Sequence, residues 1–402
     1  MANQLIKTDI CIVGGGITGC ALAAYLGQTT KKTITVIEKD WQEADRIVGE
    51  LLQPGGVHLL EKLGLGKALD NLDAQPVTGY SIYNQGKAIH IDYPLSKGLK
   101  PGYGFRNGRF VQNMRALLEP YSNVQRIEGN VTGLIYANPD QIEGAIFSNP
   151  DGSSMEVRAE LTIVSDGIFS KLRPELSLTQ QKITGFFAGL ILEQCELPQP
   201  GHGHVFITDS TPFVVYPVAT GQSRMLIDIP GDTPPKINDE FRNQLKKQIF
   251  PYLPESLKPS FIKAVETGKI KLMPNHKLHP SPAKKRGVVI IGDAFNMRHP
   301  LTGGGMTVAF TDVYHLARNI EQHLKNGYAL TSDQYINDFY NQKSDETGVI
   351  NILADALYKV VQNPILADAC FNYMKQGGEY ASGPISLLSG IVHDKRVLMK
   401  HF

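Results

Sequence analysis

The sequence predicts an α/β fold with a βαβ unit at its N-terminus, a mainly antiparallel β region interleaved with it, and helices at its C-terminus. Three observations lead to this prediction. An apolar strand pattern from Ile10 to Val13 runs directly into three glycines and an apolar helix pattern. Two more short apolar stretches, 161–164 and 287–291, each precede a turn containing Gly and Asp. The segment between these stretches includes the strand-like run Phe213 to Tyr216.

Length and composition indicate a globular enzyme of two or three domains. The chain has 402 residues, with 40 Lys plus Arg against 39 Asp plus Glu, so its formal net charge is +1. Without a basic excess, a general nucleic-acid-binding role is not expected. The four cysteines are scattered and form no CxxC pair, which argues against a disulfide scaffold or a cysteine zinc site and favours a reducing compartment.

One stretch has the length of a membrane span but not its composition. Residues 10–30 carry no charge, yet five of them are glycines. A strand, a turn and a helix explain this stretch better than a membrane helix or a secretory signal does.

The first glycine turn matches a dinucleotide-binding motif. Gly14, Gly16 and Gly19 give the GxGxxG spacing after the first strand, and the second strand, 33–37, ends at Glu38. These glycines let backbone N–H groups approach a pyrophosphate, while Glu38 can accept hydrogen bonds from ribose hydroxyls. A position this close to the N-terminus is typical of FAD proteins, although the motif alone also allows NAD.

Two later turns favour FAD. The stretch 161–164 precedes Asp166-Gly167, with Arg173 following, as in the second fingerprint of flavoprotein monooxygenases. The stretch 287–291 precedes Gly292-Asp293, and a glycine turn then opens a helix to about Gln322. We expect Asp293 to hold a ribitol hydroxyl. We expect the turn to place backbone N–H groups beside the pyrimidine edge of the flavin; its glycines are Gly303, Gly304 and Gly305.

Two long strings make a family resemblance specific. Residues 45–56 (DRIVGELLQPGG) and 292–306 (GDAFNMRHPLTGGGM) resemble the squalene monooxygenase (squalene epoxidase) family, and the similarity extends from about Asp9 to the end of the chain. Carried over by position, the family's FAD contacts fall on Ile17, Thr18, Glu38, Lys39, Arg46, Leu51, Arg115, Val131, Asp293 and Met306. The tyrosine that shapes the family's active site falls on Tyr80, and its glutamine partner falls on Gln53.

The resemblance implies a function and a set of partners. It implies epoxidation of the terminal double bond of squalene to (S)-2,3-oxidosqualene through a C4a-hydroperoxyflavin, in sterol or triterpene biosynthesis. FAD is the implied cofactor, O2 the oxidant, and an NADPH-dependent flavoprotein reductase the electron donor. The hydrocarbon substrate requires apolar walls. The candidates are Phe186, Phe213, Val215, Tyr216 and Pro300, and most of them could equally be ordinary sheet core.

We expect the domains to be arranged as in the α/β fold of flavoprotein hydroxylases. Residues 1–78, 106–172 and 284–345 form the FAD-binding domain, 79–105 and 173–283 form the substrate domain, and 346–402 form a C-terminal helical region. Eukaryotic family members carry an N-terminal membrane helix and an apolar C-terminal extension, which this chain does not include. We therefore expect peripheral contact with the cytoplasmic face of a membrane, of endoplasmic-reticulum type in a eukaryote. The tail 380–402 mixes apolar and basic residues, which suits an anionic interface or a helix pair packed on the enzyme.

Alternatives remain on the sequence alone. The chain could be another FAD monooxygenase or a prenyl-chain reductase of the same fold, or a noncatalytic binding protein on the same nucleotide-binding scaffold. His276 and His279 have no third ligand near them in the sequence, so no metal site is expected.

Overall fold

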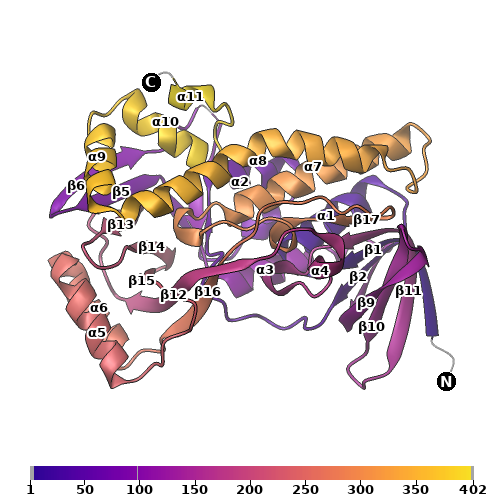
Figure 1. The fold of residues 1–402 in the computed structure, drawn as a ribbon, viewed down its shortest axis with the longest axis horizontal. Coiled ribbons are helices and arrows are strands. Elements are labelled where there is room, and N and C mark those ends of the chain that lie inside the picture. The colour runs from indigo at the N-terminus through magenta and orange to yellow at the C-terminus, as the bar shows by residue number, and fades with distance from the viewer. Residues whose placement is uncertain (1–3, 97, 400–402) are drawn as a thin grey trace.

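A seven-stranded sheet forms one layer of the molecule, and the computed structural model describes residues 4–96 and 98–399 (Figure 1). The strand order is β8-β2-β1-β11-β10-β9, and β17 pairs with β11. Strands β8, β2, β1, β11 and β17 are mutually parallel, whereas β10 and β9 extend the sheet in antiparallel fashion. The bounds are β1 (Gln4–Val13), β2 (Ile34–Glu38), β8 (Val124–Glu128), β9 (Asn130–Asn138), β10 (Gln141–Ser148), β11 (Ser154–Val164) and β17 (Val288–Ile290).

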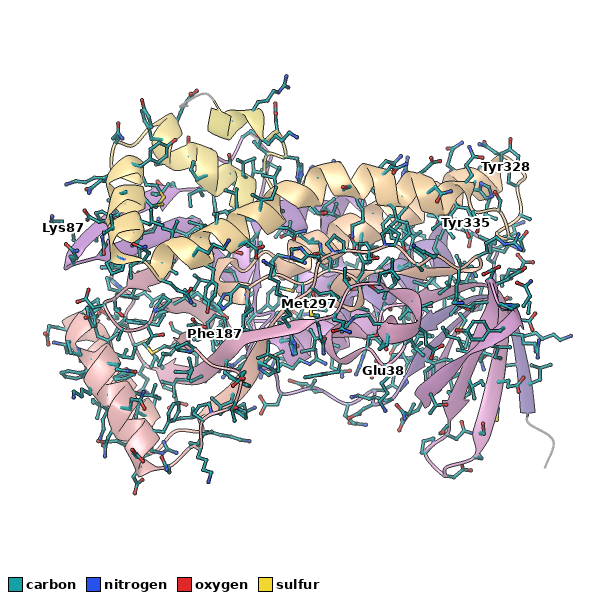
Figure 2. All side chains as sticks on the ribbon, viewed as in Figure 1. Glu38, Lys87, Phe187, Met297, Tyr328 and Tyr335 are labelled. Atoms are coloured by element: carbon teal, nitrogen blue, oxygen red, sulfur yellow. The ribbon has the colours of Figure 1, made fainter. Side chains whose placement is uncertain are left out.

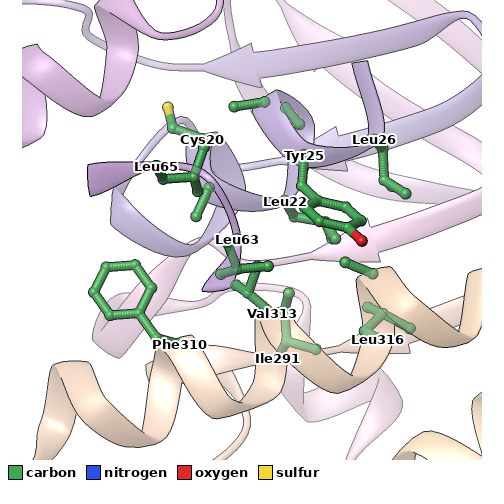
Figure 3. Packing of buried hydrophobic residues seen from close by; sticks show 14 of the residues in the cluster. Cys20, Leu22, Tyr25, Leu26, Leu63, Leu65, Ile291, Phe310, Val313 and Leu316 are labelled. Atoms are coloured by element: carbon green, nitrogen blue, oxygen red, sulfur yellow. The ribbon is translucent and has the colours of Figure 1, made fainter. Parts of the chain in front are cut away.

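Helices cover this sheet because its central strands are apolar on both faces. Ile10 and Ile12 are buried on one face of β1, and Cys11 and Val13 are buried on the other, as expected for parallel strands covered on two sides. Figure 3 shows α1 and α7 meeting through Tyr25, Phe310 and other apolar side chains. The helices around this core are α1 (Ile17–Thr29), α2 (Pro54–Lys62), α3 (Asn107–Ala116) and α7 (Gly305–Lys325). The expected N-terminal βαβ unit is present as β1, α1 and β2.

A second seven-stranded sheet has the order β16-β12-β15-β14-β13-β5-β6. Its pairings are antiparallel, except that β13 and β5 are parallel. The bounds are β5 (Gly79–Asn84), β6 (Lys87–Asp92), β12 (Lys182–Glu193), β13 (His202–Ile207), β14 (Phe213–Ala219), β15 (Gln222–Ile229) and β16 (Lys271–Lys277). Helices α5 (Asp239–Ile249) and α6 (Lys258–Glu266) pack on one of its faces.

The C-terminal helices cover the other face of the second sheet. They are α8 (Gln334–Val361), α9 (Pro364–Met374), α10 (Glu379–Leu388) and the short α11 (Arg396–Met399). Phe371 of α9 and Ile385 of α10 share one apolar cluster with Ile82 of β5. Packing of α10 on the enzyme's own core is therefore observed, while residues 400–402 of the predicted tail lie outside the described residues. Within 4–96 and 98–399, no helix is both long and apolar enough to cross a membrane.

The domain boundaries differ from the expected ones at three places. Helix α8 runs without interruption across the expected boundary between 345 and 346. Short α4 (Arg173–Leu176) belongs with the first sheet, because Leu176 packs in a core cluster with Val13. Strand β7 (Gly102–Gly104) pairs with β3 (Leu51–Leu52) and β4 (Gln75–Val77) in a separate small sheet. The sequence pattern missed these contacts because they join segments far apart in the chain.

Candidate active site

A cavity of about 760 Å³ lies between the two sheets. Its walls come from the ends of β1, β2 and β11, from the turns after β17, and from β5, β13, β14 and β16 of the second sheet. Figure 2 labels Glu38 and Met297, which both line the cavity, and Met297 lies between Glu38 and Phe187 of β12 in that view. The volume lies in the range of small-molecule and cofactor sites.

The turn between β1 and α1 forms one end of the cavity. Gly14 has φ +102°, and a Cβ there would lie 2.6 Å from the carbonyl oxygen of Ser165, so a side chain does not fit. Gly16 caps α1 and opens into free space, and Ile17 and Thr18 follow it along the cavity wall. Gly19 does not line the cavity: a Cβ there would lie 2.0 Å from the Gly14 oxygen, so this glycine permits close helix packing.

The end of β2 adds an acidic and a basic group. Glu38 Oε2 accepts a hydrogen bond from the Gly15 N–H at 2.7 Å, and Lys39 lies next to it on the cavity wall. Arg115 of α3 donates to the carbonyl oxygens of Gly15, Gln42 and Asp40 at 3.0, 3.0 and 2.9 Å. Its guanidinium therefore holds the glycine turn against the loop after β2. Val131 of β9 also lines this end.

The turns after β11 and β17 lie side by side. Arg173 Nε donates to the Ala294 oxygen at 2.8 Å and Arg173 Nη2 donates to the Gly167 oxygen at 2.9 Å, so this side chain joins the second fingerprint to the third. Asp166 lines the cavity, and burial raises the pKa of its carboxyl.

The turn after β17 places Asp293 at the cavity. Gly292 has φ +64°, and its N–H donates to Asp312 Oδ2 of α7 at 2.9 Å; Lys343 of α8 forms a buried ion pair with the same carboxylate. Burial raises the pKa of the Asp293 carboxyl, and the guanidinium groups of Arg298 and Arg46 act in the opposite direction. Both residues and Asp293 line the cavity, so the predicted Arg46 and Asp293 are brought together.

The glycine turn before α7 completes this wall. Gly303, Gly305 and Met306 line the cavity, and Leu51 faces it from β3. Gly304 does not line it: a Cβ there would approach Ile350 of α8 to 3.0 Å, so the absence of a side chain allows α8 to pack.

These residues fit FAD. The N-terminus of α1 opens toward the cavity at Gly16, where a pyrophosphate is favoured by the helix dipole and free N–H groups. Buried Asp166 Oδ1 and Arg298 Nε have no hydrogen-bond partner among the described residues, which suits a ligand that supplies hydroxyls and ring acceptors.

Gln53 and Tyr80 are in contact, as the family resemblance implies. Gln53 Nε2 donates to the Tyr80 hydroxyl in a short hydrogen bond and to the Thr302 oxygen at 3.0 Å. Tyr80 lines the cavity, whereas Gln53 is fully buried behind it. The sequence reasoning missed Tyr93, whose hydroxyl donates to Gln53 Oε1 at 2.6 Å.

A buried ion pair that the sequence did not reveal joins the two layers. Arg224 of β15 donates to both oxygens of Glu50, with Nε at 2.6 Å from Oε2 and Nη2 at 3.1 Å from Oε1. Glu50 lines the cavity, and the two residues are 1% and 4% exposed. Glu50 does lie in the DRIVGE string, but nothing in the sequence pointed to an arginine so far away as its partner.

Three of the predicted apolar wall residues face the wrong way. Phe213 and Val215 pack against α5 and α6, and Phe186 shares the strand face of Ala188 and Leu190, which pack there too. None of these three lines the cavity, so the prediction was wrong for them. Side chains alternate along β14, and Tyr216 and its neighbour Val214 face the cavity instead. Pro300, the remaining candidate, lines the cavity.

The three turns around this cavity define the class of FAD-dependent oxidoreductases. A family model described as FAD dependent oxidoreductase matches residues 9–153. Among solved structures, p-nitrophenol 4-monooxygenase from Pseudomonas putida superimposes with a TM-score of 0.76 at 17% identity, covering 99% of this chain and 98% of that one. The predicted fold class and FAD cofactor are confirmed.

Sequence comparison then identifies the family. The model described as squalene epoxidase matches residues 158–402. Squalene epoxidase 1 of Arabidopsis thaliana is 43% identical over 98% of this chain and 76% of its own length. Squalene epoxidase erg1 of Schizosaccharomyces pombe is 39% identical over 100% of this chain and 90% of its own. The chain belongs to the squalene epoxidase family, as its resemblance implied.

Proposed function

We propose that this chain is an FAD-dependent squalene epoxidase that forms (S)-2,3-oxidosqualene in sterol or triterpene biosynthesis. The observation that carries the proposal is the identity to squalene epoxidases along the whole chain, with both the cofactor half and the second sheet included. One oxygen atom of O2 enters the terminal double bond and the other leaves as water, which consumes two electrons and two protons. Bound FAD, when reduced, supplies the activation of O2.

The residues at the nucleotide end of the cavity have assignable roles in holding FAD. The N–H groups at the start of α1 would bind the pyrophosphate, Glu38 would accept hydrogen bonds from the ribose hydroxyls, and Asp293 would accept one from a ribitol hydroxyl. The N-terminus of α7 at Gly305, which lines the cavity, would add positive potential for the flavin. Together these residues would hold the cofactor in the cavity between the two sheets.

The other part of the cavity suits a hydrocarbon. Squalene has no polar group, so its binding depends on the burial of apolar surface, at about 25 cal/mol per Å². The second sheet and the adjacent loop present apolar side chains there: Val205, Val214, Leu226, Met273 and Leu301. Tyr216 and Tyr80 add aromatic surface. A dry wall of this kind orients the terminal alkene and excludes water, which would otherwise divert the oxidant to hydrogen peroxide.

Peripheral membrane contact and an external reductase complete the proposal. At the start of α9, Ile365 is 81% exposed and Leu366 is 48% exposed, which supports a lipid-facing surface on the C-terminal helices. We place this surface on the cytoplasmic face of a membrane. Flotation with anionic vesicles tests it, because Ile365→Ser together with Leu366→Ser should reduce the bound fraction, whereas Ile352→Ser on α8 serves as a control at a separate exposed apolar residue.

Product analysis tests the epoxidase activity. The purified protein should be yellow, which a noncatalytic binding protein without flavin would not be. Incubation with squalene, NADPH, a flavoprotein reductase and 18O2 should give a product heavier than squalene by one 18O atom. Hydrogenated squalene would indicate a prenyl-chain reductase instead, and no product from a flavin-loaded, reducible enzyme would refute squalene as the substrate.

A further inference from the structure

A buried carboxylate outside the cavity contacts three other elements. Asp228 of β15 is 1% exposed, and its Oδ1 lies 3.3 Å from Nε2 of His299. Tyr358 of α8 donates its hydroxyl to Asp228 Oδ2 at 3.1 Å, and Asn275 of β16 donates from Nδ2 to Oδ1 at 3.0 Å. Neither Asp228 nor Tyr358 lines the cavity, so neither can touch the cofactor or the substrate there.

The contacts of His299 fix both its orientation and its tautomer. Nδ1 accepts a hydrogen bond from the Leu301 N–H at 3.4 Å, so Nε2 carries the hydrogen, which is directed to Asp228. The Asn275 amide nitrogen also lies 3.2 Å from Nε2. The ring stacks on Tyr358 with centroids 3.6 Å apart and meets Phe187 edge-on at 5.6 Å. Because one face is stacked and both nitrogens have polar neighbours, the imidazole cannot rotate without breaking several contacts.

His299 begins the loop that reaches the flavin end of the cavity. It caps η6 (Pro300–Thr302), and Gly303 follows with φ +64°. Pro300, Leu301 and Gly303 line the cavity, while the Thr302 oxygen accepts the hydrogen bond from Gln53. The 299–305 loop is thus held at its start by Asp228 through His299, and in its middle, at the Thr302 oxygen, by Gln53 and Tyr80.

Helix α8 extends this support into the rest of the fold. Its first half packs in the core of the first sheet through Phe339, and its last residue, Val361, packs in the core of the second sheet (Figure 1). Tyr358 lies near that second end and supplies both a ring face for His299 and a hydroxyl for Asp228. Helix α8 is therefore linked to the 299–305 loop through Tyr358, which contacts both His299 and Asp228.

We infer that Asp228 is a positioning residue that sets the 299–305 loop against the flavin by orienting His299, with Tyr358 as its link to α8. The inference rests on the proposed function in one respect, because kcat and KM are measured with squalene as the substrate. Asp228 does not take part in oxygen transfer itself. It determines where the cavity wall formed by Pro300 and Leu301 lies, and so it affects how well the oxidant is protected and aimed.

The experiment compares Asp228→Asn, Tyr358→Phe and a matched control in the holoenzyme. Asp228→Asn has almost the same shape but cannot keep both acceptor oxygens. We expect its kcat to fall about tenfold with KM within about twofold, its flavin absorption band to change shape, and its peroxide yield to rise. Tyr358→Phe should change the same quantities in the same direction by about twofold to threefold. Asp228→Glu should not restore them, because the longer side chain displaces His299.

Thr211→Val is the control, because Thr211 Oγ1 donates to the backbone oxygen of Asp228 and not to its carboxylate. It should lower thermal stability without changing the flavin band or the peroxide yield. If Asp228→Asn has a normal flavin band, coupling and kcat per folded molecule, Asp228 is only structural and the inference is wrong. The flavin band of the resting holoenzyme is measured without squalene, whereas the peroxide yield and kcat are measured during turnover with squalene. A wild-type enzyme that fails to epoxidise squalene would therefore contradict the proposed function and not this inference.

Discussion

Gln53 contacts Tyr80 and Thr302 through one amide nitrogen, and Tyr93 contacts its amide oxygen. Both N–H donors of this buried amide and one of the two acceptor positions on its oxygen are therefore occupied. Since Tyr93 and Thr302 continue to anchor Gln53 when the Tyr80 hydroxyl is removed, that hydroxyl tunes the geometry of the wall and is not required to hold it together.

We therefore expect Tyr80→Phe to keep bound FAD and measurable turnover, with more of the consumed NADPH appearing as hydrogen peroxide. Removing the hydroxyl loosens the wall that excludes water. Peroxide and epoxide yields per NADPH measure the effect. Tyr83→Phe, on the same strand but stacked on Phe206, should leave both yields unchanged. Loss of epoxidation with normal flavin reduction and normal squalene binding would make the Tyr80 hydroxyl chemically essential and contradict this account.

Asp293→Ala should reduce FAD occupancy. Its carboxylate lines the cavity at the end of a buried strand, and loss of a charged hydrogen bond costs about 1.5 to 3 kcal/mol, or roughly tenfold to a hundredfold in affinity. The ratio of flavin absorbance to protein absorbance after gel filtration measures occupancy. Asp293→Asn should be intermediate, and Asp338→Ala, at an exposed position of α8, should bind FAD normally. Full occupancy in Asp293→Ala would remove this residue from the FAD site.

The turns around the cofactor could be predicted from the sequence because each follows a short buried strand. Carboxyl ends of parallel strands meet at one edge of a sheet, so Gly14, Asp166 and Asp293 come together although they are far apart in the chain. Local spacing also identified Glu38 at the end of β2. In these cases the tertiary arrangement follows from the strand pattern alone.

The second sheet could not be predicted in the same way. Phe213, Val214, Val215 and Tyr216 are all apolar, so the run does not say which alternate pair faces the cavity. Both faces of β14 are covered, one by α5 and α6 and the other by the cavity wall and the C-terminal helices. Only the packing of these distant helices decides the orientation, and no local signal carries that information.

The Glu50–Arg224 pair should contribute strongly to stability. In Arg224→Ala the buried Glu50 carboxylate loses its bidentate partner, and we expect a loss of about 3 to 5 kcal/mol in the free energy of unfolding. Urea unfolding of the FAD-loaded protein measures it. Lys263→Ala removes an exposed pair with Glu193 and should cost less than about 1 kcal/mol.

A double variant separates the loss of the partner from the loss of the pair. Glu50→Leu combined with Arg224→Met should recover part of the lost stability, because no buried charge remains. Arg224→Ala could also lower the free energy of unfolding by no more than Lys263→Ala does. That result would mean that Arg106, whose Nη1 lies 4.0 Å from Glu50 Oε1, is a sufficient partner for the Glu50 carboxylate. The ion pair would then not be a stabilising link between the layers.

His204 should make stability depend on pH. Burial lowers the pKa of its imidazole from 6.5 to about 4, and Nε2 accepts the Gln199 N–H at 3.2 Å, a contact that protonation would break. Because the unfolded chain binds this proton more readily than the folded one, the contribution is fully present above pH 6.5 and is lost as the pH falls toward 4. Between pH 7.5 and 5 the loss should be about 2 kcal/mol.

Urea unfolding at the two pH values tests this prediction. His204→Phe should reduce the difference in unfolding free energy between them by about 2 kcal/mol, whereas His279→Phe, at an exposed position, should leave the difference unchanged. An equal pH dependence in wild type and His204→Phe would show that His204 is protonated in the folded protein as readily as in the unfolded one.

Electrons should reach the flavin mainly from a partner reductase. The chain has one GxGxxG motif, at Gly14 to Gly19, and that turn lies in the FAD cavity, so no second glycine turn of this kind is left for a nicotinamide nucleotide. We expect NADPH alone to reduce the flavin slowly, and added flavoprotein reductase to accelerate epoxide formation at least about tenfold, equivalent to roughly 1.4 kcal/mol of barrier.

Anaerobic stopped-flow mixing with NADPH in the presence of squalene measures direct reduction. Photoreduced enzyme mixed with O2 is the control, since it should form epoxide in a single turnover without reductase. Direct reduction as fast as steady-state turnover would show that the enzyme is self-sufficient and that no reductase is required.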